Sequence, residues 1–469
     1  MPATHRRATT PRSRGQRGTP RARSTRPSAI AELDRLLDEA SARPASAVAS
    51  FAELGVPDAL VRALARRGIT TPFAIQNRAL PDAIAGRDVL GRAQTGAGKT
   101  LAFGLPIMTG LAGARSRPGR PRGLVLVPTR ELAMQVADEL RPLADTVGLR
   151  AAAVFGGAPY GGQLAALARG VDVVVATPGR LIDLIDRGGC ALSEVSVAVL
   201  DEADHMADMG FLPAVRRLLD DVPTGGQRLL FSATLDRGVD RLVRDYLNDP
   251  AVHAVAAAAA PVEAMDHQVF LLHPGDKVKV AAEIAARPAR TLVFVRTKHG
   301  ADRLAKQLTT LGTPAAAIHG NLSQNARQRA LAGFAAGHPR VLVATDVAAR
   351  GIHIDDVDLV VHFDPPNDAK DYLHRSGRTA RAGASGTAVS FVLPEQQGDV
   401  QRLHVDARVT PLAVPVRPGH GAVRAIAESG TPVPAPSPVR RAARPERRDG
   451  AKRYPGRRGR PVVRRKPAA

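Results

Sequence analysis

The residues that could do chemistry in this chain begin with the stretch AQTGAGKT. It fits the phosphate-loop pattern G-x-x-x-x-G-K-[ST], with alanine at the first glycine position. Glycines let the backbone wrap with its amides pointing inward, and these amides hold phosphate oxygens together with the following helix N-terminus. Lys99 is placed to reach the terminal phosphates of a nucleotide, and Thr100 to coordinate Mg²⁺. The loop residues predicted to bind the nucleotide are Ala93, Gln94, Thr95, Gly96, Ala97, Gly98, Lys99 and Thr100.

A second group of candidate catalytic residues is the tetrad Asp201-Glu202-Ala203-Asp204, which directly follows the apolar run VAVL. A carboxylate at the end of a buried strand is unfavourable unless a cation or partner compensates it. Asp201 is placed to hold Mg²⁺, directly or through water, and Glu202 to orient or deprotonate an attacking water. The other interpretation is an ordinary helix start with acids near its positive dipole end.

The third group is the stretch HRSGRTAR, residues 374–381. Arg378 and Arg381 lie three positions apart, so a helix would present both on one face. Arginines delivered to a γ-phosphate stabilise the charge of the transition state. A solvated basic helix is the alternative in an arginine-rich chain. If the loop and these arginines serve one nucleotide, the site is divided between two domains that nucleotide binding draws together.

The elements that must position these residues alternate between strands and helices, which predicts an α/β fold with parallel sheets covered on both faces. Functional residues then follow the carboxyl ends of the strands. Two such series are separated by VAAAAAP at 255–261. The predicted strands are Val89–Leu90, Leu124–Val127, Val171–Ala176, Val197–Leu200 and Leu229–Phe231, then Leu292–Val295, Ala316–Ile318, Val341–Ala344, Leu359–Phe363 and Ala388–Val392. The predicted parts are an N-terminal tail 1–48 with a short helix near 30–40, a first domain 49–255, a linker 256–264, a second domain 265–410 and a C-terminal tail 411–469.

Net charge is +22, and most of it lies at the two ends of the chain. Residues 1–27 carry +8 and residues 440–469 carry +11, so the middle is nearly neutral. Such ends are predicted to be disordered. They are either solvated tails or, as we favour, non-specific tethers to a polyanion, with binding that weakens in salt. Arg458-Gly459-Arg460-Pro461 is similar to a minor-groove-binding hook, a pattern that chance also produces in such a tail.

Location is predicted from what the chain lacks. It has one cysteine, Cys190, and no apolar run of the ~18 residues that a membrane-spanning helix needs. These features predict a cytoplasmic protein without a membrane partner. An N-terminus rich in Arg, Ser and Thr and free of acids also fits an organelle transit peptide, although the Ala/Arg/Gly/Pro-rich composition favours a bacterial origin.

With these motifs the chain resembles the DEAD-box ATP-dependent RNA helicases of superfamily 2, of the bacterial type. Members of this family have two tandem RecA-like domains. The resemblance covers roughly 51–395 and rests on motifs in one order: Phe51 and Gln76, AQTGAGKT, PTRELA (128–133), Gly156-Gly157, TPGR (177–180), DEAD (201–204), SAT (232–234), VFVRTK (293–298), ATDVAARGI (344–352) and HRSGRTAR.

The resemblance implies a role for each matching residue. Gln76 would read the edge of adenine and Phe51 would pack against its ring. Asp346 and Gly351 would face ATP from the second domain, and Arg378 and Arg381 would be arginine fingers. Coupling of hydrolysis to domain closure would fall to Ser232, Thr234, Asp204 and His374. The residues implied to grip RNA are Thr129, Arg130, Gly157, Thr177, Gly179, Arg180, Arg296, Gly320, Thr345 and Arg350.

The chain departs from the family pattern at three places. His353 stands where the family often has Asp, which leaves a ribose or phosphate contact to Asp355 or Asp356. Ile69 replaces a frequent aromatic residue near the adenine, and the residues after Gln163 lack a common basic residue.

The resemblance implies that a monomer hydrolyses ATP with Mg²⁺ and locally unwinds short RNA duplexes. Aromatic residues make up 3% of the chain and Trp is absent, so base stacking is not expected and the grip falls on the sugar-phosphate backbone, without sequence specificity. The partners are single-stranded RNA and short duplexes. Two alternatives remain: an ATP-gated RNA clamp or annealing chaperone, and a DNA translocase of the wider superfamily.

Overall fold

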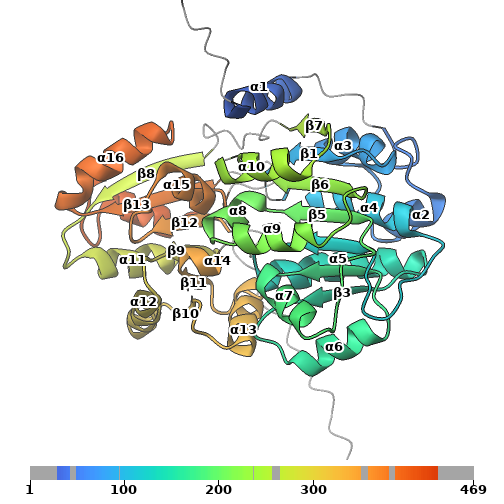
Figure 1. The fold of residues 1–469 in the computed structure, drawn as a ribbon. Helices are drawn as coiled ribbons and strands as arrows, with labels where there is room; N and C mark the ends of the chain where they lie inside the picture. The colour runs from blue at the N-terminus through green and yellow to red at the C-terminus, as the bar shows by residue number, and fades with distance from the viewer. Residues whose placement is uncertain are drawn as a thin grey trace, which may run out of the picture. The chain divides into compact units, whose positions relative to one another are not determined.

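The computed structural model describes residues 29–42, 49–94, 96–235, 237–255, 265–349, 357–379 and 386–430. The predicted linker 256–264 and most of both predicted tails lie outside these residues. Two parallel seven-stranded sheets flanked by helices form the fold (Figure 1). This arrangement confirms the prediction of an α/β fold with two tandem RecA-like domains.

The first sheet has the order β3-β4-β2-β5-β6-β1-β7. Its strands are β1 (Val89–Arg92), β2 (Gly123–Leu126), β3 (Ala151–Val154), β4 (Val173–Ala176), β5 (Val197–Asp201), β6 (Gln227–Ser232) and β7 (Ala251–Ala254). Its helices are α1 (Ala29–Ala42), α2 (Asp58–Arg66), α3 (Ala74–Ile84), α4 (Lys99–Leu111), α5 (Arg130–Thr146), α6 (Tyr160–Ala168), α7 (Pro178–Asp186), α8 (Ala203–Asp208), α9 (Leu212–Asp220) and α10 (Arg237–Tyr246).

The second sheet has the order β10-β11-β9-β12-β13-β8-β14, which repeats the topology of the first strand for strand. Its strands are β8 (Met265–Leu271), β9 (Thr291–Phe294), β10 (Ala315–Ile318), β11 (Val341–Ala344), β12 (Leu359–His362), β13 (Gly386–Val392) and β14 (Leu412–Pro415). Its helices are α11 (Lys277–Ala285), α12 (Lys298–Thr310), α13 (Gln324–Ala335), α14 (Asp346–Ala349), α15 (Ala369–Ser376), the 3-10 helix η3 (Pro394–Gln396), α16 (Gln397–Asp406) and α17 (Gly421–Ala427).

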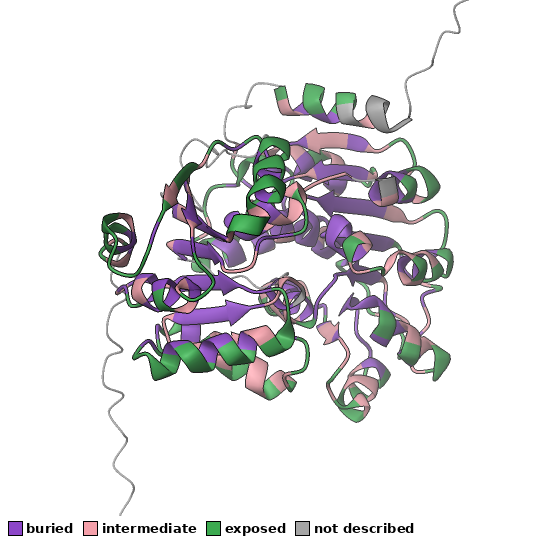
Figure 2. Cartoon of the chain, turned by 90° about the vertical axis from the view of Figure 1, so that its left-hand side faces the viewer, coloured by how far each residue is buried: buried purple, intermediate pink, exposed green. Residues whose placement is uncertain are grey.

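Both faces of each sheet are buried, which explains the continuous apolar runs in the sequence. Along β1, Val89 belongs to the core on one face and Leu90 to the core on the other. The second sheet repeats this alternation, with Val293 and Leu292 of β9 in separate cores. Figure 2 shows the buried strands inside and the exposed surface on the outer faces of the helices. The packing fixes the carboxyl edges of the strands, where the predicted site residues lie.

Two of the predicted tail boundaries differ from the structure. Helix α1 lies within the predicted N-terminal tail, yet Leu37 and Ala40 are buried in the first domain's core. Strand β14 and helix α17 lie beyond residue 410, and Val423 and Ile426 pack in the second domain's core. These short helices are stabilised because their apolar residues, at helical spacing, are buried against the domains. The polar residues around them had suggested tails.

Candidate functional site

The phosphate loop lies between β1 and α4, as the sequence predicted. Gly96 and Gly98 have φ values of 89° and 82°, a region that residues with a Cβ rarely adopt. Gly98 directly precedes helix α4, so the backbone amides of the loop lie at a helix N-terminus. Thr95 lies outside the described residues. The loop therefore has the geometry of an anion cradle.

The predicted adenine reader, Gln76, is fixed beside this loop. Its Nε2 donates to the carbonyl of Gly98 at 2.8 Å, and its Oε1 accepts from the Phe73 amide at 2.9 Å. Gln76 is buried, and a Cβ on Gly98 would collide with both Gln76 and Phe73. The glutamine thus ties the start of α3 to the phosphate loop.

The aromatic residue near the loop is not the one the family pattern implied. Phe51 packs in the first domain's core with 2% of its surface exposed. Phe73 is 59% exposed and lies against Gly98. Phe73 could not be identified from the sequence, because an apolar residue before a helix is usually part of the core. The exposed aromatic surface available to a base here belongs to Phe73.

Lys99 and Glu202 form a buried ion pair, with Nζ 2.7 Å from Oε1. Lys99 Nζ also donates to the carbonyl of Ala93 at 3.2 Å. Burial opposes the charge on Lys99, but attraction by Glu202, Asp201 and Asp204 outweighs it and raises the pKa of Lys99. Glu202 itself has φ of 55°, a strained backbone conformation for a residue with a side chain. The pair brings the phosphate loop and the DEAD tetrad into one site.

Asp201 supplies the carboxylate that a divalent cation requires at this site. Burial is the largest influence and raises its pKa to about 7, against the attraction of Lys99. A buried carboxylate whose ionisation is this unfavourable fits a cation ligand, because the cation would restore the charged form. Thr100, the other predicted ligand, follows Lys99 in the first turn of α4.

The predicted coupling between the tetrad and the SAT motif is present in the structure. Asp204 Oδ2 accepts from both the amide and the hydroxyl of Thr234, at 3.0 and 2.8 Å. The Asp204 amide donates to Ser232 Oγ at 3.2 Å, and that hydroxyl donates to the Thr234 carbonyl. Burial and Glu202 oppose ionisation of Asp204, but His205, Lys99 and Thr234 together hold its pKa below the usual value. These bonds tie the start of α8, which follows β5, to the segment that follows β6.

The HRSGRTAR stretch begins in the last turn of α15, which ends at Ser376, so Arg378 follows the helix instead of lying on one of its faces as expected. Its His374 meets the first domain. The rings of His374 and His205 pack edge to face with centroids 5.0 Å apart. Burial, with His205 next, lowers the pKa of His374 to about 4, so the ring is neutral near pH 7. Arg378 is 6% exposed and lines a small cavity with Asp346 and His374. Arg381 and Gly351 lie outside the described residues, as does His353.

Asp346 does not lie free to meet a nucleotide. Arg375 donates to both of its carboxylate oxygens, at 2.6 and 2.7 Å, and also to the carbonyl of Asp364. The Arg375 side chain is 3% exposed. This bidentate pair fixes α15 against the start of α14. Arg375 was missed from the sequence, where it was one basic residue among four.

The two domains also contact each other through residues that the sequence reasoning did not single out. Arg327 Nε lies 2.7 Å from Glu131 Oε1, and Gln324 Nε2 donates to the same oxygen at 3.3 Å. Lys370 Nζ lies 2.9 Å from Asp208. Glu131 follows the predicted RNA residues Thr129 and Arg130, so α13 of the second domain joins the first domain beside them. The importance of these charged residues becomes apparent only from their partners in the other domain, and it cannot be deduced from the residue types alone.

The predicted RNA residues of the first domain lie at neighbouring strand ends. The guanidinium of Arg130 packs on Gly157, which has φ of 83°, and a Cβ there would displace the guanidinium. Arg180 donates to the carbonyl of Ala158 at 2.9 Å and stacks 4.0 Å above the Tyr160 ring. The other predicted members occupy helix starts, with Thr129 capping α5, and Thr177 and Gly179 at the start of α7. Backbone amides and arginines thus gather along one edge.

The predicted RNA residues of the second domain also lie directly after strands. Arg296 is exposed after β9 and its amide donates to Asp364 at 3.0 Å. Gly320 follows β10, and Thr345 follows β11, where its amide donates to the Ile318 carbonyl. Arg350 lies outside the described residues.

Comparison with known proteins decides the family. A model of the DEAD/DEAH box helicase family matches residues 73–242, and one of the helicase conserved C-terminal domain matches residues 276–383. The ATP-dependent RNA helicase DBP2 of Debaryomyces hansenii is 41% identical over 374 residues, covering 77% of this chain and 70% of that protein. The chain belongs to the DEAD-box ATP-dependent RNA helicase family.

Two other relatives show how far the likeness to this DEAD-box chain extends. The chloroplastic DEAD-box ATP-dependent RNA helicase 3A of Zea mays is 45% identical over 374 residues, covering 76% of this chain and 49% of that protein. S. cerevisiae Dbp5, solved with RNA and ADP BeF3, superimposes with a TM-score of 0.70 at 28% identity, covering 80% of this chain and 98% of that one. The chain spans about half the length of the maize relative, and 59% of the length of a matching Arabidopsis thaliana helicase.

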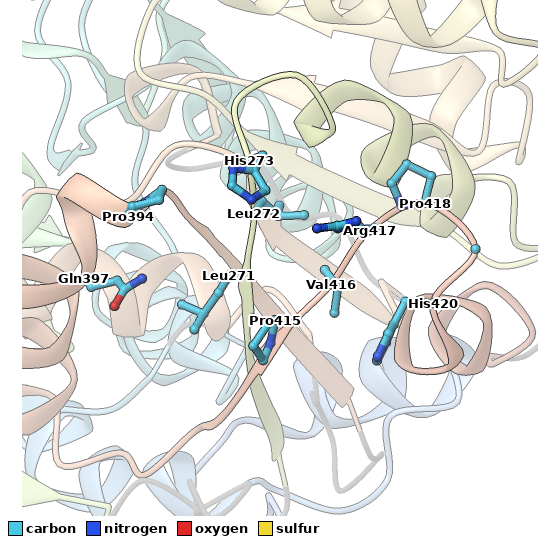
Figure 3. A pocket seen from close by; sticks show the side chains of 11 residues that line it. Leu271, Leu272, His273, Pro394, Gln397, Pro415, Val416, Arg417, Pro418 and His420 are labelled. Atoms are coloured by element: carbon cyan, nitrogen blue, oxygen red, sulfur yellow. The ribbon is translucent and has the colours of Figure 1, made fainter.

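A separate cavity of about 570 Å³ lies in the second domain of this DEAD-box chain, beyond the ends of β8 and β14. Figure 3 shows His273, Arg417 and Pro418 at one side of it. None of the described residues lining it belongs to the predicted site. In the part of the chain that the structure describes, no helix has the length and apolarity needed to cross a membrane.

Proposed function

We propose that this chain is an RNA-stimulated ATPase that locally unwinds short RNA duplexes without sequence specificity. The observation that carries the proposal is the contact between His205, beside the DEAD tetrad, and His374, at the start of the HRSGRTAR stretch. It brings the tetrad of one domain beside the HRSGRTAR stretch of the other. A nucleotide in this position would be held by both domains, so its hydrolysis would change how they pair.

The hydrolysis step follows from the Lys99–Glu202 pair. Phosphate oxygens of ATP in the loop would draw Lys99 away from Glu202, because they carry more negative charge than one carboxylate. Glu202 would then be available to orient the attacking water and accept its proton. Arg378, with Arg381 from outside the described residues, would stabilise charge on the γ-phosphate.

We assign the remaining nucleotide contacts as follows. Gln76 would recognise the adenine edge and Phe73, rather than the buried Phe51, would pack against the base. Asp201 and Thr100 would hold Mg²⁺, partly through water, and the ion would neutralise phosphate charge. Asp346, now paired with Arg375, and Gly351 would complete the site from the second domain.

RNA as the substrate is supported by the relatives and by the chain's own strand ends. Dbp5 was solved with RNA, and several relatives are described as RNA helicases. In this chain, Arg130, Gly157 and Arg180 lie where the strands of the first domain end, as do Arg296 and Thr345 in the second. These groups suit the sugar-phosphate backbone, since arginines and amides bind phosphate oxygens.

The deciding experiment compares ATP hydrolysis by the full chain with RNA, with DNA of the same sequence, and without nucleic acid, alongside unwinding of a short RNA duplex. Stimulation by RNA alone together with unwinding supports the proposal. Stimulation by DNA would identify a translocase. RNA-stimulated hydrolysis with annealing but no unwinding would identify a clamp or annealing chaperone.

We also propose a monomeric, cytoplasmic protein of bacterial type, with Arg-rich ends that tether nucleic acid non-specifically. Composition and charge support this, and the relatives named above are from plants and yeasts, one of them chloroplastic. Removal of residues 440–469, followed by salt titration of binding to duplex RNA and DNA, tests the tether. Unchanged binding to both would contradict it.

A further inference from the structure

The edge strand β3 of the first sheet ends at Val154, two residues before Gly156, and among the strands that the structure describes it pairs with β4 on one side alone (Figure 1). Its sequence is Ala151-Ala152-Ala153-Val154. Ala152 and Ala153 are partly exposed, and Ala151 is 8% exposed. A groove of about 590 Å³ runs along the strand, and its three alanines are among the lining residues.

The direction of the backbone groups can be deduced from the bonds to β4. The Val173 amide donates to the Arg150 carbonyl at 3.0 Å, and the Thr177 amide to the Val154 carbonyl at 2.9 Å. Consecutive residues of a strand direct their N–H and C=O groups to opposite sides. Ala151 and Ala153 therefore direct theirs into the groove.

Beyond Ala153, the edge is already paired by a side chain that imitates a strand. Phe155 is the next residue that faces outward. Its amide donates to Gln163 Oε1 at 3.2 Å, and its carbonyl accepts from Gln163 Nε2 at 3.2 Å. This carboxamide makes the two bonds that one residue of an added strand would make. The backbone N–H and C=O groups of Ala153 and Ala151 continue this line of donors and acceptors along the groove.

The walls of the groove carry net positive charge. Arg141 on α5, Arg150 before β3 and Arg169 after α6 line it, and Asp138 is its acidic lining residue, paired with Arg141 at 2.7 Å. Arg150 donates to the Arg169 carbonyl at 2.7 Å, which fixes the wall next to the strand. An occupant with acidic side chains is therefore favoured over a basic or neutral one.

We propose that β3 is a docking site for an extended acidic segment of a partner protein, which adds to the first sheet as a further strand. A polynucleotide fits less well, because phosphates offer acceptors and would leave the carbonyls of Ala151 and Ala153 without donors. A second copy of this chain would bring the same arginines face to face. The chain's own C-terminal residues 440–469 carry +11 and would also be repelled.

The test uses full-length protein and a fluorescein-labelled peptide of alternating Glu and Val, capped at both ends. We expect saturable binding at low salt, measured by anisotropy. Hydrogen exchange read by mass spectrometry should slow in a fragment covering 150–155. The same peptide with N-methylated backbone amides keeps its charges but cannot pair as a strand, and should not bind.

The variant for this test is the double charge reversal Arg141→Glu with Arg169→Glu, which should weaken binding roughly tenfold or more. Arg402→Glu is the matched control, because Arg402 is also exposed and paired three residues away, with Asp399. It should leave binding unchanged. Basal ATP hydrolysis should be the same in all three proteins.

Three results would overturn the proposal. Equal binding of the N-methylated peptide would show attraction by charge alone. Protection of the 150–155 fragment by a ten-nucleotide poly(U) strand that displaces the peptide would assign the groove to RNA. Concentration-dependent dimerisation that is abolished by adding the peptide would assign the groove to a second copy of the chain.

Discussion

The side chain of Lys99 in the phosphate loop is bound to Glu202 of the DEAD tetrad, 2.7 Å away and shielded from solvent. In the proposed mechanism Lys99 binds phosphate and Glu202 orients water, and here the two side chains neutralise each other. Breaking such a buried pair is expensive, so the phosphates must replace the carboxylate as they enter. Such an exchange would link nucleotide binding to activation of Glu202.

Replacing Glu202 with Gln should separate binding from turnover. Without the carboxylate, Lys99 is released from its ion pair and the negative charge near the phosphates falls, so ATP should bind as tightly or several-fold more tightly. Hydrolysis should fall by roughly 10²-fold or more, because the water loses its base. Equilibrium binding of a labelled ATP analogue and single-turnover hydrolysis measure the two effects. RNA-stimulated turnover at the native rate would refute the role of Glu202.

Replacing Lys99 with Ala should abolish nucleotide binding, which Glu202→Gln retains. Nucleotide binding is lost together with unwinding, and the acids Asp201, Glu202 and Asp204 remain buried without their cation. Stability should therefore fall by about 3 kcal/mol. Urea unfolding measures this change, and Lys99→Arg serves as the control that keeps the charge. An Ala variant that still binds ATP would contradict the loop assignment.

Removal of the Phe73 ring should weaken ATP binding specifically. Phe73→Ala removes an exposed aromatic surface beside Gly98, and the apparent KM for ATP should rise roughly tenfold, the scale of one stacking contact. Phe73→Tyr should retain the native value. Phe51→Leu, in the core, should lower stability with little change in KM. The reverse result for the two phenylalanines would return the base contact to Phe51.

The contact of Glu131 with Arg327 should couple the two domains. Arg327→Glu places two acids together and should reduce RNA-stimulated ATP hydrolysis, while ATP binding to the first domain is retained. Adding Glu131→Arg restores opposite charges, so the double variant should recover part of the activity. A charge-swapped protein no more active than Arg327→Glu would show that the pair does not couple the domains.

Much of this architecture could be predicted from the sequence, because apolar runs followed by polar or glycine residues mark the ends of buried parallel strands. The strands that escaped were β3, β7, β8 and β14, at or next to the sheet edges. The sequence AAAV of β3 shows why, since alanine favours helices and only pairing with β4 makes this segment a strand.

The parts of the candidate site that could be predicted are those in which the residue type and its place in a short motif indicate its chemical role. Lys99, Glu202, Asp204 and Thr234 are of this kind, and the structure places them together. Arg327 could not be found in this way, because its importance arises from a partner almost two hundred residues away. Phe73 could not be predicted from the sequence, because its exposed position depends on its neighbours in space and not on its residue type.

Acidification should destabilise the second domain through a buried histidine. His404 packs edge to face on Tyr372 with ring centroids 4.9 Å apart. Burial, aided by His267, lowers its pKa from 6.5 to about 4. The fold therefore favours the neutral ring, and the stability from this group is complete above pH 6.5 and lost as pH falls toward 4.

The measurement is the melting temperature between pH 8 and pH 4.5. His404→Phe keeps an aromatic ring that cannot be protonated, so its melting temperature should fall less than that of the native protein, by roughly 3 °C. His299→Phe, on the exposed face of α12, is the control and should follow the native curve. An identical acid dependence for native protein and His404→Phe would exclude this histidine as the cause.

The central claim is that one ATP site is shared by both domains, and Arg378→Ala tests it most directly. The variant leaves every described group of the phosphate loop and the tetrad in place. ATP binding should be close to native, while RNA-stimulated hydrolysis should fall by at least about 10²-fold, since an arginine finger contributes ~10³–10⁵ to turnover. Hydrolysis at the native rate in Arg378→Ala would contradict a site completed by the second domain.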